Sequence, residues 1–206
     1  MTISEATKFI EKAFNTFNKK YFEGALPQVA ITIQASPKAY GHFTVNKVWE
    51  ISEEHTHEIN IGAENLNRPI EETIGTLIHE MVHLYCHENN IQDTSRRGQY
   101  HNKTFKAEAE KRGLIISYDK RIGWSITTPT EQLKEYCKRV FKIQRLEIVR
   151  QGIFGADTNK TKSKSYKYTC PNCDCSFKST KDLHLICGVC FEDNEDINFM
   201  TKEVIQ

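Results

Sequence analysis

Residues 79–83 read His-Glu-Met-Val-His, a pattern in which two histidines and a glutamate can do metal chemistry together. Residues four apart on a helix lie on the same face, one turn from each other, so His79 and His83 can share one Zn²⁺. Glu80 then lies within reach of a water at the metal, where it can act as general base. The pattern predicts zinc-assisted peptide hydrolysis. The plain alternative is two ordinary histidines on a half-buried helix.

The residues around this pattern predict the helix that it needs. Pro69 is tolerated in a first helical turn, and Glu71 and Glu72 are acids near the positive end of the helix dipole. Apolar residues then recur at spacings of three and four, which is typical of a helix buried on one side. They are Ile70, Ile74, Leu77, Ile78, Met81, Val82 and Tyr85.

A catalytic zinc site usually has three protein ligands, so a third one is expected. His101 is the favoured candidate, because it follows a polar loop and opens a second helical pattern that Asn102 can cap. Glu108 on that second helix is the alternative. His87 and Cys86 are weaker candidates, because three ligands on one straight helix converge poorly. The longer pattern H-E-x-x-H-x-x-G-x-x-H is not met, since Cys86 and Asn89 occupy its last two defining positions.

These stretches resemble the SprT-like metallopeptidases, the family of bacterial SprT and eukaryotic Spartan. The resemblance rests on Thr76–His83 and Tyr100–Lys106, with Phe22–Pro27 and Tyr40–Phe43 similar to the family's lead-in, and it covers roughly residues 5 to 125. It departs where Gln99 and Tyr100 replace a leading glycine and where the loop between the motifs is longer than in Spartan. The resemblance implies a zincin-like peptidase that acts on proteins attached to DNA.

Four cysteines near the carboxy-terminus predict a second zinc site with a different role. Cys170, Cys173, Cys187 and Cys190 form two C-x₂-C knuckles, and four thiolates make a closed, structural zinc ribbon. Such a short segment has little apolar core, so metal binding must supply much of its folding energy. The alternative is a pair of disulfides, which an odd total of seven cysteines and the lack of a signal peptide disfavour. Cys175 is expected to be a bystander near the knuckle, and Cys86 and Cys137 are expected to be buried thiols.

The net charge of +1 is unevenly distributed. Residues 138–167 hold nine basic and two acidic side chains, a balance of +7, so the remainder of the chain carries −6. Basic side chains contact phosphates and aromatic rings stack on unpaired bases, and Tyr166, Tyr168 and Phe177 lie nearby. We therefore expect nucleic acid as a partner, single-stranded DNA above all. The alternative is a linker that its charge keeps solvated. The expected contacts are Lys160, Lys162, Lys164 and Lys167.

The remaining patterns place these sites in an α+β protein. A helix over about 4–21, with a capping box at Thr2 and Glu5, comes first. A strand at 29–34, a hairpin over 40–61, a strand pair over 114–127 and a helix over 130–141 follow. Residues 59–61 are the candidate edge strand for substrate. His42, His55 and His57 lack helical spacing and are interpreted as surface or strand residues.

The predicted architecture is a peptidase domain with a small antiparallel sheet and a central H-E-x-x-H helix (1–128), a helix and basic linker (129–163) and a zinc ribbon (164–206). No apolar run approaches the ~20 residues that cross a bilayer, so no membrane partner is expected. The cysteine usage favours a reducing cytoplasm, with association to the nucleoid if the chain is tethered to DNA. Two other functions stay open. One is a nucleic-acid-binding adaptor with an idle or regulatory peptidase fold. The other is a peptidase whose ribbon recognises a specific protein substrate.

Overall fold

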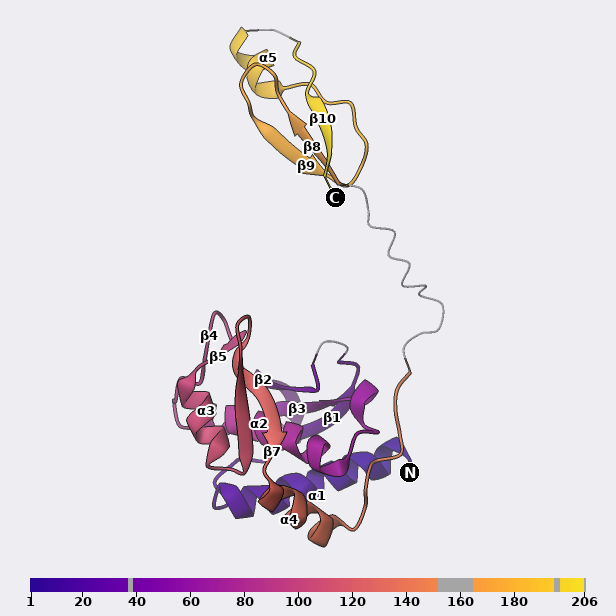
Figure 1. Cartoon of the computed structure of the whole chain (residues 1–206), viewed down its shortest axis with the longest axis vertical. Coiled ribbons are helices and arrows are strands. Elements are labelled where there is room, and N and C mark those ends of the chain that lie inside the picture. The colour runs from indigo at the N-terminus through magenta and orange to yellow at the C-terminus, as the bar shows by residue number, and fades with distance from the viewer. Residues whose placement is uncertain (37–38, 152–164, 195–196, 206) are drawn as a thin grey trace. The chain divides into compact units, whose positions relative to one another are not determined.

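The computed structural model of the chain describes residues 1–36, 39–151, 165–194 and 197–205. The chain divides into two compact units, Met1–Gly152 and Ile153–Gln206, and each is described by itself. Together they form a mixed α+β protein (Figure 1). Among the described residues, no helix has both the length and the apolar character needed to cross a membrane.

The first unit begins with helix α1 (Ile3–Tyr21). The predicted capping box is confirmed: the backbone N–H of Glu5 donates to the Thr2 hydroxyl, and the Thr2 N–H donates to the Glu5 carboxylate at 2.7 Å. One face of α1 is buried in the main core. That face consists of Ala6, Ile10, Ala13, Phe14 and Phe17.

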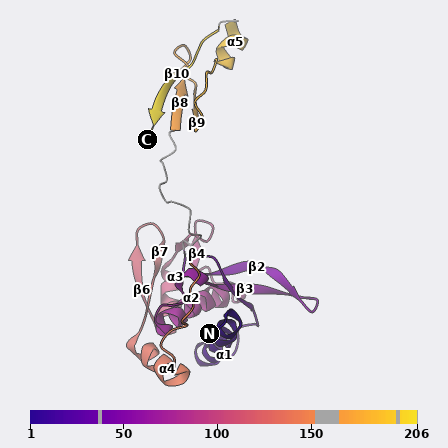
Figure 2. The same cartoon turned by 90° about the vertical axis from the view of Figure 1, so that its right-hand side faces the viewer.

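The first sheet contains β1 (Ala30–Gln34), β2 (Gly41–Ile51) and β3 (Glu54–Gly62) in the order β1-β3-β2. The predicted hairpin is confirmed: β2 and β3 are antiparallel, and Ser52 and Glu53 both have positive φ, as a two-residue hairpin turn of type I′ requires. Figure 2 shows this hairpin extending away from the helices.

Two predictions about this sheet were wrong. The sheet is mixed, because β1 pairs with β3 in parallel. Residues 59–61 also do not form an edge, since β3 is paired on both sides and lies buried from His57 onward. Periodicity within one segment does not reveal which distant segment pairs with it. Among the described strands, the two edge strands of this sheet are β1 and β2, and each has one unpaired edge.

Helix α2 (Ile70–Glu88) begins after Pro69 as predicted. It contacts the first sheet, a second sheet of the same unit, and the helices α1, α3 and α4. The short 3₁₀ turn η1 (Ala63–Asn65) leads into it from β3. The predicted apolar face is buried, apart from the half-buried Tyr85. The position of α2 between the layers explains why so many of its side chains are enclosed.

The second sheet has the order β4-β5-β7-β6. Its strands are β4 (Thr94–Ser95), β5 (Tyr100–His101), β6 (Leu114–Asp119) and β7 (Gly123–Pro129). Helix α3 (Lys103–Glu110) follows β5, and its predicted cap is confirmed, because the Asn102 side chain accepts from the N–H groups of Thr104 and Phe105. This connection places His101 directly before a helix start.

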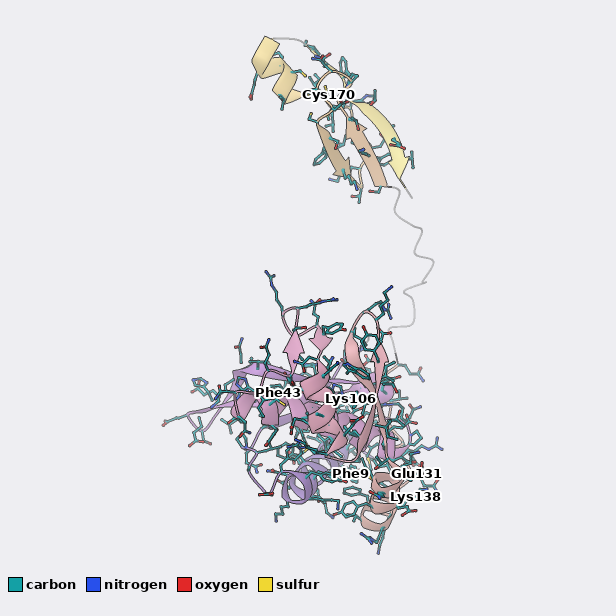
Figure 3. The ribbon with its side chains drawn as sticks, turned by 60° about the vertical axis from the view of Figure 1, so that its left-hand side comes forward. Phe9, Phe43, Lys106, Glu131, Lys138 and Cys170 are labelled. Carbon is teal, nitrogen blue, oxygen red and sulfur yellow. The ribbon has the colours of Figure 1, made fainter. Side chains whose placement is uncertain are left out.

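The predicted helix over 130–141 is confirmed as α4 (Glu131–Phe141), which Thr130 caps and which packs against α2 within the first unit. Phe141 contacts Phe9 of α1 edge to face, with ring centroids 5.1 Å apart. Figure 3 labels Phe9 of α1 together with Glu131 and Lys138 of α4. The chain beyond α4 returns to the start of α2, where the Ile70 N–H donates to the Gln144 carbonyl at 2.7 Å and Leu146 is buried. The segment up to residue 151, which we expected to be part of a linker, therefore lies against the first unit.

The second unit is a three-stranded antiparallel sheet with one short helix. Its strands β8 (Ser165–Thr169), β9 (Ser176–Ser179) and β10 (Thr201–Ile205) have the order β10-β8-β9, and α5 (Gly188–Asn194) precedes β10. Its buried core is small and consists mainly of cysteines, with Tyr168 beside them in the sequence. Little apolar surface is available to stabilise it.

Candidate metal centre and active site

The structure brings His79, His83 and His101 together at one point. Their Nε2 atoms are separated by 3.2 Å (His79 to His83), 3.2 Å (His79 to His101) and 3.0 Å (His83 to His101). Helix α2 supplies the first two side chains, one turn apart, and strand β5 supplies the third. Phe105 of α3 is buried against all three rings and supports them from one side.

The other ring nitrogen of each histidine is hydrogen bonded. His79 Nδ1 lies 2.7 Å from the Thr127 hydroxyl, His83 Nδ1 lies 2.5 Å from the Asp93 carboxylate, and His101 Nδ1 lies 3.3 Å from the Ile122 carbonyl. The carbonyl and the carboxylate accept hydrogen bonds, so Nδ1 of His83 and His101 carries the proton. The Nε2 lone pairs of the cluster therefore point toward one another.

Converging lone pairs repel unless a cation lies between them. Two nitrogens bound at ~2.0–2.1 Å to one tetrahedral Zn²⁺ lie about 3.3 Å apart, close to the separations found here. Burial lowers the pKa of His79 well below its usual value, and burial with the nearby His83 lowers the pKa of His101 to about 4. Neutral imidazoles are the form that binds metal, so this cluster suits a metal ion.

Glu80 is buried beside the cluster, with 5 % of its surface exposed. Burial raises the pKa of Glu80 to about 7, while His83 and the backbone N–H of Phe43 act against that shift. A cation at the histidines would favour the carboxylate further. The backbone of β2 comes close to Glu80 at Gly41, where an added Cβ would lie 2.8 Å from the Asn60 carbonyl and 3.4 Å from Glu80 Cγ.

A cleft of about 1230 Å³ gives access to this centre. Gly41, His42 and Phe43 of the edge strand β2 line part of it, and Ser125–Pro129 of β7 line another part. The three histidines and Glu80 also belong to its lining. An open edge strand beside a cleft suits an extended peptide, which can pair with it backbone to backbone.

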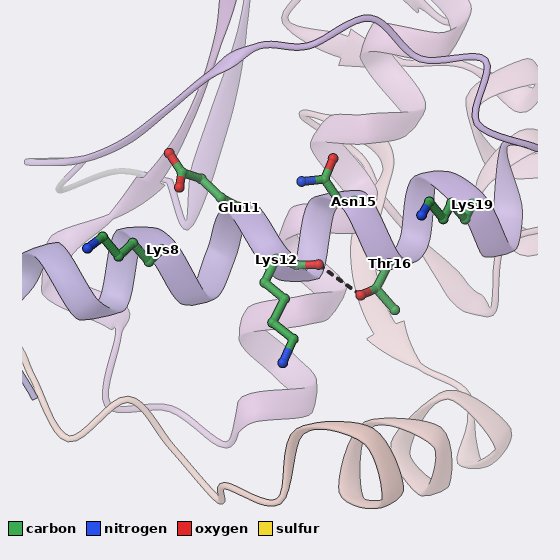
Figure 4. Close-up of a pocket in the computed structure, with 6 residues that line it drawn as sticks. All are labelled: Lys8, Glu11, Lys12, Asn15, Thr16 and Lys19. Carbon is green, nitrogen blue, oxygen red and sulfur yellow. Dashed lines mark hydrogen bonds between the residues drawn. The ribbon is translucent and has the colours of Figure 1, made fainter.

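A second hollow in the surface has a different character. It lies on the exposed face of α1 (Figure 4), where Thr16 donates to the Lys12 carbonyl within the helix. All of its lining comes from one helix and consists of solvated polar side chains, so it shows none of the convergence found in the cleft. The residues are Lys8, Glu11, Lys12, Asn15, Thr16 and Lys19.

The alternative third ligands lie elsewhere. Both Glu108 carboxylate oxygens are engaged, one at 2.6 Å from Lys111 Nζ and the other at 2.7 Å from Arg112 Nη1. Burial raises the pKa of the Cys86 thiol to about 12, which keeps it protonated. His87 faces His57 and Phe43 and does not join the cluster.

Sequence reasoning missed Asp93 and Thr127, which hold His83 and His79 through Nδ1. Asp93 lies ten residues beyond His83, and Thr127 lies 48 beyond His79. Neither has a spacing that marks it, because loop and strand contacts follow no helical period. The only available signal was an acid in the loop between two metal-binding motifs.

We expect Asp93→Asn to weaken metal binding at the histidines by about 10–100-fold, because loss of such an outer partner has effects of that size. The amide keeps the shape of the side chain but loses the charge that stabilises metal-bound imidazole. Competition with a chromogenic chelator measures the affinity. Glu135→Gln, an exposed change on α4, is the control and should leave it unaltered. Equal affinities in the two variants would contradict the role of Asp93.

Gly123 determines how β5 meets β7, and therefore where His101 lies. Its φ is +76°, and an added Cβ would lie 2.2 Å from the His101 carbonyl oxygen. We expect Gly123→Ala to displace β5 and to lower both the melting temperature and zinc retention. Gly98→Ala is the matched control, since its φ is +83° but nothing lies within 4 Å. If both variants lose zinc equally, backbone strain alone explains the effect.

The second unit brings its four predicted cysteines together. Sγ of Cys170 lies 3.7 Å from that of Cys190, and Sγ of Cys173 lies 3.6 Å from that of Cys187. Thiolates at ~2.3 Å from one tetrahedral Zn²⁺ lie about 3.8 Å apart, whereas disulfide sulfurs are ~2.05 Å apart. The four are free cysteines in a cluster that can hold a metal.

The knuckle backbone favours thiolates in this cluster. The N–H of Cys173 lowers the pKa of Cys170, and the N–H of Cys190 lowers the pKa of Cys187 to about 6. Cys175 was expected to be a bystander. Its Sγ lies 3.3 Å from that of Cys187, and this hydrogen bond raises the pKa of Cys175 to about 12. It therefore stays a thiol that donates to its neighbour.

The predicted nucleic-acid contacts are described only in part. Lys160, Lys162 and Lys164 lie outside the described residues. Lys167 is half-buried on β8, between Lys178 of β9 and Glu203 of β10. Tyr168 is buried and hydrogen bonded, so it is unavailable for stacking on a base, whereas Phe177 is exposed.

A mixed α+β unit with a histidine cluster, a buried glutamate and an open cleft defines a metallopeptidase-type domain. Residues 10–118, more than half of the chain, match the SprT-like family. The chain belongs to the SprT-like family, as its motifs predicted. Comparison with curated proteins and with solved structures gave no match.

Proposed function

We propose that the chain is a zinc-dependent endopeptidase of zincin-like type. The observation that carries this proposal is the convergence of three Nε2 atoms beside a buried carboxylate at an open cleft. His79, His83 and His101 would hold the ion. When bound there, Zn²⁺ supplies Lewis acidity toward the scissile carbonyl and toward water.

The protein's own groups then position the substrate and move the proton. Glu80 takes a proton from the attacking water and passes it to the leaving amine nitrogen. An extended substrate lies along the free edge of β2, so Gly41–Phe43 would align its backbone across the histidines. A purely structural metal site would need the histidines but not Glu80, which argues against an idle fold.

Removal and return of metal test this proposal directly. We expect the purified chain to cleave an unstructured protein, to lose that activity on dialysis against a strong chelator, and to regain it with Zn²⁺. Circular dichroism of the treated protein controls for unfolding. Cleavage that continues after elemental analysis shows the metal to be gone would contradict a zinc mechanism.

We also propose that the substrates are proteins attached to DNA, which the basic segment 138–167 would contact. The described basic residues of this segment that precede β8 are all exposed, and only Arg150 among them forms a described ion pair, whereas Lys167 on β8 is half-buried. The exposed residues are Lys138, Arg139, Lys142, Arg145 and Arg150. Residues 165–206 instead carry four basic and seven acidic side chains. The charge therefore supports the segment that precedes β8 as the phosphate contact, and tethering would raise the local concentration of substrate.

A salt titration distinguishes this substrate from a protein recognised by the ribbon. Binding to single-stranded DNA should weaken with salt, with a log–log slope of about −0.7 per phosphate contact. Serine at Lys160, Lys162, Lys164 and Lys167 should flatten the slope, whereas serine at the exposed Lys8, Lys12, Lys19 and Lys47 should not. Absent or salt-independent binding, with no effect of DNA on cleavage, would favour a specific protein substrate.

A further inference from the structure

A second cluster of metal-binding side chains lies at the carboxy-terminal end of α2. His87 and Glu88 come from the last turn of this helix, and His57 comes from β3. One ligand atom from each lies within 4.8 Å of the other two. None of the three takes part in the histidine cluster of the active site.

His57 is held as a metal ligand would be. The residue is 2 % exposed, and its Nδ1 lies 3.2 Å from the Thr44 carbonyl oxygen, to which it donates. That hydrogen bond assigns the proton to Nδ1 and leaves a lone pair on Nε2. Within the described part of the chain, the buried Nε2 has no hydrogen-bond partner.

The unpartnered nitrogen faces the two helix residues. His57 Nε2 lies 3.4 Å from Glu88 Oε1, and the His57 and His87 rings meet edge to face with centroids 5.1 Å apart. A nitrogen and an oxygen bound to one tetrahedral zinc ion at ~2.0–2.2 Å are roughly 3.3–3.6 Å apart. The pair is therefore already spaced for a shared ion, and a carboxylate balances part of its charge.

We propose that His57, His87 and Glu88 form an accessory site for a divalent cation of the Zn²⁺ class. Two imidazoles and one carboxylate suit zinc and related transition metals rather than Mg²⁺ or Ca²⁺, and water would complete the coordination. His87 and Glu88 are exposed, which gives the ion a path of entry. A bound ion would link β3, which carries His57, to the end of α2. Because the folded chain binds the ion and the unfolded chain does not, the ion would also stabilise the fold.

The test uses the full chain with its two tight zinc sites already loaded. Titration with Zn²⁺ should show one further equivalent, weaker than the first two. His87→Ala and Glu88→Gln change exposed positions, so the fold should survive, and each should weaken this event by more than the ~10–100-fold of an outer-partner loss. His55→Ala, an exposed histidine on the same strand, is the control and should leave it unchanged.

Nitrogen NMR of the histidine rings locates the ion. We expect the Nε2 resonance of His57 to move on addition of the third equivalent while that of His55 stays in place. A titration that ends at two equivalents, or a third event that His87→Ala and Glu88→Gln leave intact, would overturn the proposal. A His57 ring protonated on both nitrogens in the presence of Zn²⁺ would also overturn it and assign an ion pair with Glu88. None of these readouts depends on peptidase activity.

Discussion

Glu80→Gln should lower the rate of peptide hydrolysis by about 10²–10⁴-fold, the range typical of general acid–base catalysis, while zinc stays bound. Glutamine has nearly the same shape but cannot accept the proton of the attacking water. Glu80 is also outside the group of three histidines, so its loss removes no ligand. The fold should persist, because a neutral amide carries no charge to bury. Burial of the charged carboxylate is what raises the pKa of Glu80 to about 7.

Three measurements on the same preparation make this prediction sharp. They are the initial rate of cleavage, the zinc content by elemental analysis, and the melting temperature. Glu11→Gln, an exposed change on α1, supplies a control with the same chemistry far from the cleft. A Glu80→Gln protein that retains zinc and cleaves at the wild-type rate would rule out Glu80 as the base.

His101→Ala should abolish both activity and zinc retention at the histidine cluster. The remaining His79 and His83 offer two ligands, whereas catalytic zinc sites usually have three. After dialysis against a chelator that spares the cysteine site, zinc content should fall from two equivalents to one. The ribbon keeps its ion, because its four sulfurs lie in the separate second unit.

Glu108→Ala is the matched control for the third ligand. Glu108 was the alternative from the sequence, but its carboxylate is bound to Lys111 and Arg112. This variant should keep the zinc of the histidine cluster even if it loses some stability. Zinc lost from Glu108→Ala but kept by His101→Ala would reverse the assignment.

Local sequence patterns determined those parts of the protein whose partners lie a few residues apart. The four-residue spacing of His79 and His83 places them on one helix face, whatever the rest of the fold does. Caps at Thr2 and Asn102 likewise act on backbone groups two or three residues away. The two cysteine knuckles are equally local. These features could be predicted because a short stretch of chain is enough to define their geometry.

The tertiary structure decided what depends on contacts between distant segments. His101 joins the cluster only because β5 pairs with β7 at Gly123, and sequence spacing alone left Glu108 open. The central place of β3 was missed for the same reason, since the parallel pairing with β1 is set by packing. Long-range contacts have no fixed period along the chain, so no local pattern in the sequence predicts them.

The clearest case is the pair of histidines His57 and His87, which the sequence analysis set aside. They are 30 positions apart and come from a strand and a helix, so neither spacing nor composition relates them. The packing of α2 against β3 brings their rings to within 5.1 Å and leaves one buried nitrogen facing Glu88. The sequence determined which groups can bind metal, and only the packing of helix on sheet decided which of them meet.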